Sequence, residues 1–357
     1  MNILFVNSTN QWAGIKTWMA HLGLFLHQRS HNVRFICRNA DALVNFCQQQ
    51  SIPCTSLRFG ADYNPFTVSR LISIMKRDKT DLLVTNISKD IRTAGVAARI
   101  LGIAHVNRLG LPTDLKNSFR QTWEYRHWVD EVIVPSTSLA KAFLLRDELC
   151  GKVINFPNVV KEVVDQPSNN EIPQLAIVAQ LSRRKQVHLV INALSQLRHL
   201  PWHLHIGGFG PEEKALKSQV ENLDLNSKIS FYGFVDPYFF LRDKDVGILY
   251  STSEGMPNAV LEYMASGCAV IASNLPSLQE VIQHNQNGML VDPKDTENFQ
   301  ETLTLLLTDR AKRICLSEQA LRKVREDHCL PIIFKQIEKN FSELIEAKTS
   351  RYQLQLA

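Results

Sequence analysis

The sequence predicts an α/β protein with two doubly wound, parallel-sheet domains. Short apolar runs of strand length alternate with helical patterns along the chain, and repeated strand–helix units form parallel sheets covered on both faces. The alternation occurs in two halves, separated by a segment rich in Pro, Asn and charged residues at about 156–173. A chain of 357 residues also exceeds the size at which one core usually stops growing. Each half is therefore expected to be Rossmann-like.

Strands and helices of the first half are predicted from these runs in order. Strands are expected at 2–6, 32–37, 81–85, 104–108 and 131–134, where apolar residues cluster. Helical patterns lie between them, at about 15–29, 66–77, 89–102 and 136–147. Each strand is thus followed by a helix, which is the repeat that a parallel sheet requires.

The second half repeats the same alternation and ends in an added helix. Strands are expected at 174–180, 202–207, 228–232, 245–250, 269–272 and 288–291. Helices are expected at about 184–198, 211–223, 257–266 and 294–308. A last amphipathic pattern, 331–348, begins with Pro, as helices often do. We therefore place domains at 1–160 and 161–330, followed by a C-terminal helix within 331–357.

Composition limits the classes of function. The chain is 45% hydrophobic and 21% charged, as in ordinary soluble proteins, and no apolar run approaches the roughly 18 residues that span a bilayer. The start, MNILFVN, resembles a first strand and not a signal peptide. The seven cysteines are scattered without metal-binding spacing, which favours free thiols in a reducing compartment. We expect a cytoplasmic protein.

The charge balance points to an anionic partner. The formal net charge is +5 and the isoelectric point is near 8.8. A mildly basic protein suits an anionic substrate or a weak attraction to an anionic membrane surface. No basic block resembles a nucleic-acid patch, so no nucleic acid partner is expected.

The most informative segment is STSEGMPNAVLEYMASG, residues 251–267. Glu254 falls in the turn after the strand at 245–250. Glu262 lies inside the next helix, and seven residues separate the two glutamates. Pro257 suits the first helical position because its missing N–H has no partner there. The free N–H groups of that helix start can bind an anion, while carboxylates accept hydrogen bonds from hydroxyl groups. This pattern suits a nucleotide-sugar, which has both a diphosphate and many hydroxyls.

The segment SEGMPNAVLEYMASGCAVIAS resembles the signature of glycosyltransferase family 4, which comprises retaining enzymes of the GT-B fold. The resemblance implies two Rossmann-like domains facing across a cleft, an N-terminal acceptor domain and a C-terminal donor domain. It also implies a C-terminal helix that packs back on the N-terminal domain. In such a fold ligands bind outside the carboxyl ends of the strands, where Glu254 is expected.

The resemblance also implies roles for individual residues. Glu254 would contact the transferred sugar, and Glu262 would bind the ribose hydroxyls. Lys185 matches a family lysine at the diphosphate, but the family's preceding Gly-Arg pair is replaced by Ala179 and Gln180, so Arg183 or Arg184 is a candidate substitute. Phe234 and Val235 lie where the family holds the base. The predicted donor-binding residues are Gly14, Arg183, Arg184, Gly208, Phe234, Val235, Gly255, Met256, Pro257, Asn258, Val260 and Glu262.

The N-terminal half offers weaker matches. Gly14 follows the first strand, where the family has a glycine-rich loop near the diphosphate, and Ala13 replaces its first glycine. The family's histidine position near the reacting sugar is occupied by Leu109, with Arg108 beside it. We predict Glu254, Lys185 and Arg108 as catalytic residues, and Asn86, Trp12 and Arg108 as acceptor contacts.

One aromatic and basic segment has two interpretations. The sequence FRQTWEYRHW, residues 119–128, interleaves aromatic and basic side chains. Such a segment suits a membrane interface or a lipid-linked acceptor. It also suits an amphipathic helix packed on its own domain. A peripheral contact with the inner face of the membrane is therefore one of the partners considered.

The predicted reaction is a retaining, metal-independent transfer of a sugar from a nucleotide-diphosphate sugar, favoured as a UDP-sugar, to an acceptor hydroxyl. No metal-binding cluster is evident, so no cofactor is expected, and basic side chains must stabilise the departing diphosphate. Family members often build bacterial polysaccharide or lipopolysaccharide, which implies a glycan or lipid-linked acceptor. Three alternatives remain: a sugar phosphorylase or nucleotide-sugar epimerase of the same fold, a Rossmann oxidoreductase, and a degenerate nucleotide-sugar-binding subunit. The incomplete glycine fingerprint disfavours the oxidoreductase.

Overall fold

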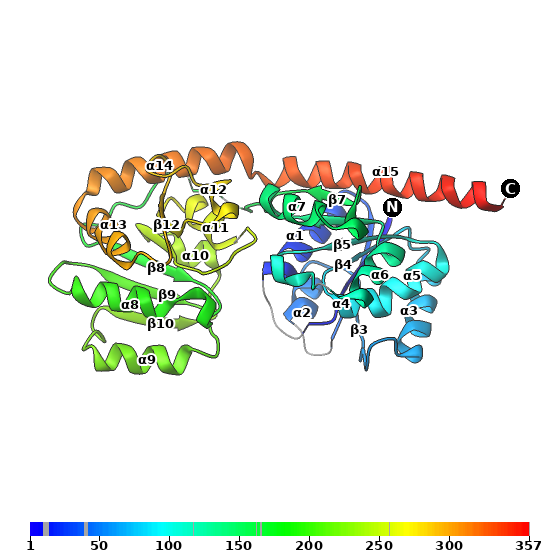
Figure 1. Ribbon diagram of the computed structural model, residues 1–357, viewed down its shortest axis with the longest axis horizontal. Helices are drawn as coiled ribbons and strands as arrows, with labels where there is room; N and C mark the ends of the chain where they lie inside the picture. The colour runs from blue at the N-terminus through cyan, green and yellow to red at the C-terminus, as the bar shows by residue number, and fades with distance from the viewer. Residues whose placement is uncertain are drawn as a thin grey trace. The chain divides into compact units, whose positions relative to one another are not determined.

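A computed structural model of the protein describes the chain except residues 10–13, 39–41, 117, 162, 165, 257 and 357, and except the side chains of residues 14, 15, 112 and 351–356. The predicted site residues Trp12 and Pro257 lie outside the described residues. The chain forms two compact units. Unit 1 is Met1–Pro157 with Pro331–Ala357, and unit 2 is Asn158–Leu330 (Figure 1).

Unit 1 is built on a seven-stranded parallel sheet with the order β3-β2-β1-β4-β5-β6-β7. Its strands are β1 (Asn2–Asn7), β2 (Asn32–Cys37), β3 (Cys54–Ser56), β4 (Leu82–Thr85), β5 (Ala104–Arg108), β6 (Glu131–Val134) and β7 (Val153–Asn155). The chain runs outward from β1 to β3 and then returns to β4, beside β1. This pair is the topological switch point of the sheet, where the loops after the two strands diverge and leave room for a ligand.

Helices cover both faces of this sheet (Figure 1). They are α1 (Gly14–Gln28), α2 (Ala42–Gln49), α3 (Pro65–Arg77), α4 (Ser88–Asp90) continued by a π turn at Ile91–Gly95 into α5 (Val96–Leu101), α6 (Phe119–Trp128), α7 (Thr137–Leu144) and α15 (Leu330–Leu356). Side chains alternate between the faces of a strand. Accordingly Leu4 and Val6 pack with α3 and α5, whereas Phe5 stacks on Phe35 under α1.

The long C-terminal helix belongs to unit 1. Phe334 of α15 is fully buried and meets the edge of the Phe25 ring, with ring centroids 5.5 Å apart. Glu338 accepts a hydrogen bond from Arg29 Nε and lies 2.7 Å from His31 Nε2. Farther along, Lys348 Nζ donates to Asp130 Oδ1 over 2.5 Å. Apolar and ionic contacts therefore attach this helix to α1 and to the loop before β6.

Unit 2 has a six-stranded parallel sheet with the order β10-β9-β8-β11-β12-β13. The strands are β8 (Gln174–Val178), β9 (His203–Gly207), β10 (Ile229–Gly233), β11 (Val246–Leu249), β12 (Ala269–Ser273) and β13 (Met289–Val291). Here β8 and β11 form the switch point. The loops after these two strands are therefore where a ligand site is expected.

The helices of unit 2 also cover both faces (Figure 1). They are α8 (Val187–Gln196), α9 (Glu213–Asn222), α10 (Pro237–Leu241), α11 (Asn258–Ala265), α12 (Pro276–Gln279), α13 (Thr296–Thr308) and α14 (Arg310–Asp327). Leu175 and Ile177 of β8 pack with α8 and α13, whereas Ala176 packs with α11 and α14. Gly247 lets Tyr263 of α11 lie against β11, because a Cβ there would be 2.2 Å from the Tyr263 ring.

The predicted α/β class with two parallel sheets is confirmed, and several short elements were not foreseen. The three-residue strands β3 and β7 and the short helices α10 and α12 give no periodic signal of useful length. Part of the expected linker at 156–173 is hydrogen-bonded into unit 2: Val160 N donates to His328 O and Val164 N donates to Ala265 O. Within the described part of the chain, no helix has both the length and the apolar character needed to cross a membrane.

Candidate functional site

The loops that leave β8 and β11 bring three charged side chains together at the switch point of unit 2. Lys185 Nζ donates to Glu254 Oε1 over 2.5 Å, and Arg184 NH1 lies 2.8 Å from the same oxygen. Arg184 and Lys185 follow β8 and lie in a 3₁₀ turn at Arg183–Lys185, whereas Glu254 follows β11. Residues 69 positions apart in the sequence therefore meet because their strands are neighbours.

This cluster is buried. Lys185 and Glu254 are each 9% exposed, and Arg184 is half-buried. Burial lowers the pKa of the Lys185 ammonium, because desolvation disfavours the charged form, and the Glu254 carboxylate opposes that effect. A buried ion pair needs close geometry to offset the loss of hydration. Both cations bind Oε1, which leaves the second carboxylate oxygen as the atom available to accept from a ligand hydroxyl.

The loop that carries Glu254 is fixed by hydrogen bonds to its backbone. Thr252 N donates to Arg184 O over 3.0 Å, and Arg184 NH1 donates to Ser253 O. Ser277 Oγ donates to Glu254 O over 2.8 Å. Asn158 Nδ2 donates to Met256 O over 2.7 Å. The loop is therefore held on several sides, and the predicted donor contacts Gly255 and Met256 are buried within it.

Helix α11 places the second acid after this loop. The described helix begins at Asn258, which is half-buried, and Glu262 lies one turn along it. Burial raises the pKa of the Glu262 carboxyl to about 7, with a smaller contribution from the nearby Asp236 carboxylate. Val260 packs in the hydrophobic core, so its side chain faces away from a ligand at the loop.

The ends of β9 and β10 form the neighbouring part of the same edge. Gly208 N donates to Gly233 O over 2.5 Å, and Ala179 N donates to Gly207 O over 3.0 Å. A Cβ on Gly208, whose φ is +129°, would lie 1.9 Å from Ala179 O. Glycine is therefore required there by the approach of the loop after β8. Phe234 is 69% exposed beside this edge, and Val235 is partly buried.

Of the two arginines considered as substitutes for Gln180, the structure brings Arg184 to Glu254. Arg183 is exposed and its NH1 lies 3.7 Å from Glu212 Oε2. Gln180 is exposed as well. The cationic part of the cluster therefore consists of Arg184 and Lys185.

The candidate residues of unit 1 lie at the carboxyl edge of its own sheet. Arg108, at the end of β5, is buried with its guanidinium 4.7 Å from the centre of the Trp18 ring. Burial lowers its pKa to about 10, and the Asp114 carboxylate opposes this effect. Asn86 follows β4 and is buried. Gly14 is the first residue of α1.

The burial of Lys16 and Asp90 in unit 1 was not anticipated from the sequence. Lys16 Nζ donates to Thr9 O over 2.8 Å, and Asp90 Oδ1 accepts from Ser8 N over 3.0 Å. Both residues hold the chain just after β1. Both residues lie near the start of a helix that follows a strand, and this position was the signal available in the sequence. Many solvent-exposed charged residues occupy the same kind of position, so it does not predict burial.

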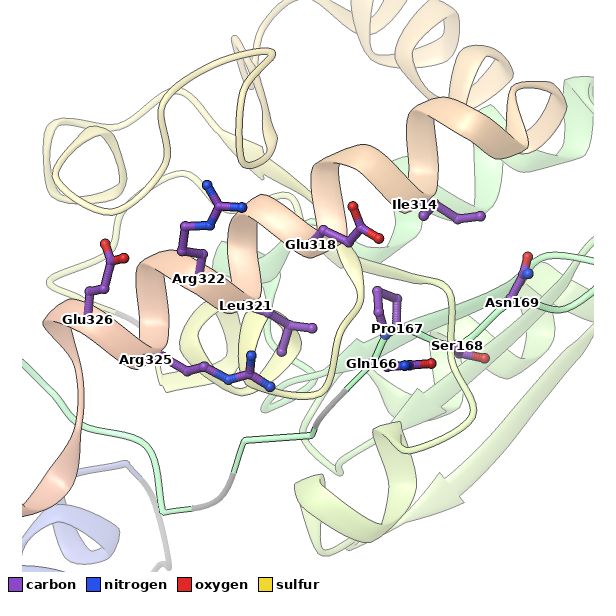
Figure 2. Close-up of a pocket in the computed structure, with 10 residues that line it drawn as sticks. All are labelled: Gln166, Pro167, Ser168, Asn169, Ile314, Glu318, Leu321, Arg322, Arg325 and Glu326. Atoms are coloured by element: carbon purple, nitrogen blue, oxygen red, sulfur yellow. The ribbon is translucent and has the colours of Figure 1, made fainter.

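One open groove of about 600 Å³ lies elsewhere on unit 2 (Figure 2). It runs between residues 166–169 and the exposed side of α14, and it is lined by both acidic and basic side chains, among them Glu318, Arg322 and Arg325. Arg325 NH2 also donates to Val164 O over 2.6 Å. None of the predicted site residues lines this groove.

Comparison with known proteins gives a family match that lies within unit 2. Residues 161–323 match the family described as Glycosyl transferases group 1. An uncharacterized glycosyltransferase of Haemophilus influenzae is 29% identical over 137 residues, which cover 38% of this chain and 38% of that protein. The lipopolysaccharide core biosynthesis glycosyltransferase LpsE of Rhizobium meliloti is 27% identical over 157 residues, covering 44% of this chain and 45% of LpsE. These matches therefore span less than half the length of each relative.

A solved structure matches nearly the whole chain. The crystal structure of Anabaena Alr3699/HepE in complex with UDP and glucose has a TM-score of 0.82 and 18% identity, and the match covers 96% of this chain and 100% of that one. This likeness shows the fold, with its two Rossmann-like parallel-sheet units, to be GT-B. Together with the group 1 domain and the names of the relatives, it supports a transferase enzyme of the glycosyltransferase class.

Proposed function

We propose that this protein is a retaining, metal-independent glycosyltransferase of family 4 that moves a sugar from a UDP-sugar to an acceptor hydroxyl. One observation carries the proposal: a buried carboxylate, Glu254, is held by Lys185 and Arg184 at the switch point of unit 2. Glu262 follows one helical turn into α11. The neighbouring HepE structure was determined with UDP and glucose, which favours a uridine nucleotide here.

The two acids divide the donor between them in this proposal. Glu254 accepts hydrogen bonds from hydroxyls of the transferred sugar, and the cations on its Oε1 fix its orientation. Glu262 accepts hydrogen bonds from the ribose hydroxyls. These hydroxyls take the place of water around its half-buried carboxylate. Phe234 and Val235 line the base, since both lie on the neighbouring strand end. Gly208, Gly255, Met256, Asn258 and the backbone at Pro257 and Val260 complete the donor contacts.

The departing diphosphate is stabilised by basic side chains. Lys185 and Arg184 place two positive charges at one point of the edge, and the backbone N–H groups at the start of α11 add a positive end. A charge-assisted hydrogen bond contributes about 1.5–3 kcal/mol, whereas a helix terminus contributes about 0.3–1 kcal/mol. The side chains therefore dominate. Arg183 and Gly14 act more weakly at the same phosphates.

The acceptor is proposed to be a glycan or a lipid-linked glycan of bacterial polysaccharide or lipopolysaccharide synthesis. The named activities of relatives such as LpsE support this class. Unit 1 would bind it through Asn86, Trp12 and Arg108. Phe119 is 87% exposed on α6 and Trp123 is partly exposed beside basic residues, which favours a peripheral contact with a membrane that carries the acceptor.

A transfer assay tests the proposal. The purified protein is incubated with UDP-, GDP- and ADP-sugars, a glycan acceptor and a chelator, and the anomeric configuration of the product is read by NMR. The proposal predicts transfer from a UDP-sugar with retention, and loss of transfer in Glu254→Gln. Glu213→Gln, which changes an exposed carboxylate on α9, is the matched control and keeps activity.

Three results would contradict the proposal. Wild-type turnover by Glu254→Gln would remove the assigned role of Glu254. An inverted product would exclude the retaining mechanism. Sugar release that needs inorganic phosphate, or epimerisation without any acceptor, would identify a phosphorylase or an epimerase instead.

A further inference from the structure

The switch point of unit 1 contains a network of buried side chains, of which the proposed function uses only Asn86. The loop after β1 begins with Ser8 and Thr9, and the loop after β4 begins with Asn86. These strands are neighbours in the sheet. Loops that leave such a pair of strands diverge, and ligands bind between them.

Asp90 lies between the two loops. Its carboxylate is fully buried, and Oδ1 accepts from Ser8 N over 3.0 Å. Burial raises the pKa of this carboxyl to about 7, while hydrogen bonding by Ser8 and by the backbone N–H groups of Ile87 and Asn86 opposes the rise. Oδ1 thus ties α4, which follows β4, to the loop after β1, whereas Oδ2 has no hydrogen-bond partner among the described residues.

Other side chains hold the remaining polar groups of the loop after β1. Arg38 Nε donates to Ser8 O over 2.5 Å, and Lys16 Nζ donates to Thr9 O over 2.8 Å. Asn7 Oδ1 accepts from both Thr9 N and Thr9 Oγ1. Every backbone N–H and C=O of Ser8 and Thr9 is thus bound by a side chain, three of which are ionisable.

Asn86 is the polar residue that this network leaves for a ligand. Its side chain is 3% exposed, and neither Oδ1 nor Nδ2 has a hydrogen-bond partner among the residues that the structure describes. A buried amide without partners is destabilising, so its presence calls for a functional reason. An amide offers one acceptor and two donors, which match a sugar hydroxyl.

We propose that Asp90 is a positioning residue for the acceptor: it joins the exits of β1 and β4 and so presents the Asn86 amide to a hydroxyl of the acceptor sugar. This inference rests on the proposed function. Asn86 makes the contact, whereas Asp90 acts from α4, which begins two residues after Asn86, through its hydrogen bond to Ser8 N. The consequence is that the two residues form one unit, and that removing either one removes the same interaction.

The test compares Asp90→Asn with Asp81→Asn in the full-length protein. Asp81 Oδ2 accepts from Asn2 N over 2.7 Å, so it forms the same kind of tie at the opposite end of β1. We expect Asp90→Asn to lower kcat/KM for the acceptor by roughly 10- to 100-fold, because small misplacements of a binding group cost that much. Its affinity for UDP, measured by calorimetry, should stay at the wild-type value. Asp81→Asn should lower the melting temperature but leave both readouts unchanged.

A double-mutant cycle separates positioning from general destabilisation. Asn86→Ala should raise the acceptor KM, and the double variant should be no worse than the more impaired single variant. Three results would each overturn the inference. They are a double variant whose loss in kcat/KM is the product of the two single losses, equal losses in kcat/KM in Asp81→Asn and Asp90→Asn, and wild-type kinetics in Asp90→Asn. If Asp90→Asn does not fold, Asn86→Ala decides: an unchanged acceptor KM overturns it. A wild-type protein that transfers no sugar would instead refute the proposed function on which the inference rests.

Discussion

At the scale of single residues, the central feature is that two cations share one oxygen of Glu254. Lys185 and Arg184 approach Oε1 from the loop after β8, and the Glu254 side chain is only 5% exposed. Such an arrangement fixes the carboxylate without using both of its oxygens. It also concentrates positive charge where the proposed function places the departing diphosphate, and charge placed in advance is the main way enzymes stabilise transition states.

The role of Lys185 leads to a first prediction. Lys185→Met removes the buried ammonium and leaves Glu254 with Arg184 alone, so kcat/KM for transfer should fall by about 10²- to 10³-fold. The free energy of unfolding should also fall, because one partner of a buried pair is lost. Steady-state kinetics and urea denaturation measure the two effects. Lys217→Met, which removes an exposed partner of Glu213, is the control, and equal kinetics in both variants would refute the assignment.

Glu262 leads to a prediction about pH. Its pKa is raised to about 7 in the folded protein, above the ordinary value near 4.3 expected for the unfolded chain. The folded state therefore binds the proton more tightly, and this carboxyl makes the wild type less stable as pH rises from about 4.3 to about 7. Glu262→Gln does not titrate. It should be more stable than the wild type by about 1–3 kcal/mol at pH 8 and about equal at pH 4.

Denaturation of both proteins at the two pH values checks this expectation. The same variant should bind UDP more weakly, since it loses the carboxylate that accepts from ribose. A stability difference that does not change between pH 4 and pH 8 would show that Glu262 ionises normally.

At the scale of elements, the position of each strand in the sheet decides which loops meet. The sequence predicted strands near β8 and β11, and it predicted the loops after them as sites. It could not show that these strands are neighbours, because sheet order is set by packing over long separations. For the same reason the meeting of Arg184, and not Arg183, with Glu254 was left open. The buried Asp90 and Lys16 were missed because their sequence context resembles that of surface charges.

Short and irregular elements were the other part of the fold that the sequence did not predict. The strands β3 and β7 contain only three residues each, so neither gives an alternating pattern. The helix α14 carries many charged residues and buries only a narrow stripe that includes Leu316, Ala320 and Val324. Long periodic segments such as α3 and α13 were predicted because their apolar positions recur at helical spacing.

The loop after β9 supports a prediction about backbone approach. Gly208→Ala would place a Cβ 1.9 Å from Ala179 O at a φ of +129°, so the loop after β8 must move. We expect a loss of roughly 3 kcal/mol or more in the free energy of unfolding, and weaker UDP binding. Gly233→Ala has a φ of +65° and no atom within 4 Å of its Cβ, so it should cost only about 1 kcal/mol. Equal costs in urea denaturation would contradict this account.

At the scale of the whole molecule, the chain is two units with separate cores. Unit 1 includes both ends of the chain, because α15 packs on it through Phe334, Glu338 and Lys348. The parallel sheets of both units follow from the strand–helix alternation seen in the sequence. All residues of the proposed donor site except Gly14 belong to unit 2, so the stability of the two units is expected to respond differently to nucleotide.

This separation gives a prediction for α15. Phe334→Ala removes a fully buried ring from unit 1 and should cost about 3–5 kcal/mol in the unfolding of that unit. Affinity for UDP, which unit 2 is proposed to bind, should remain. Ile332→Ala changes a side chain that is 52% exposed on the same helix and should cost much less. Calorimetric scans with and without UDP measure both quantities, and loss of UDP binding in Phe334→Ala would contradict the separation.

The most direct measurement of the central claim is a calorimetric titration of UDP-sugars into the wild type and Glu262→Gln. We expect saturable binding at one site per chain in the wild type, weakened at least about tenfold by the substitution, since a hydrogen bond to a charged group is lost. The absence of binding heat with UDP-, GDP- and ADP-sugars alike, or equal affinities in the two proteins, would contradict a nucleotide-sugar site built on the acids of unit 2.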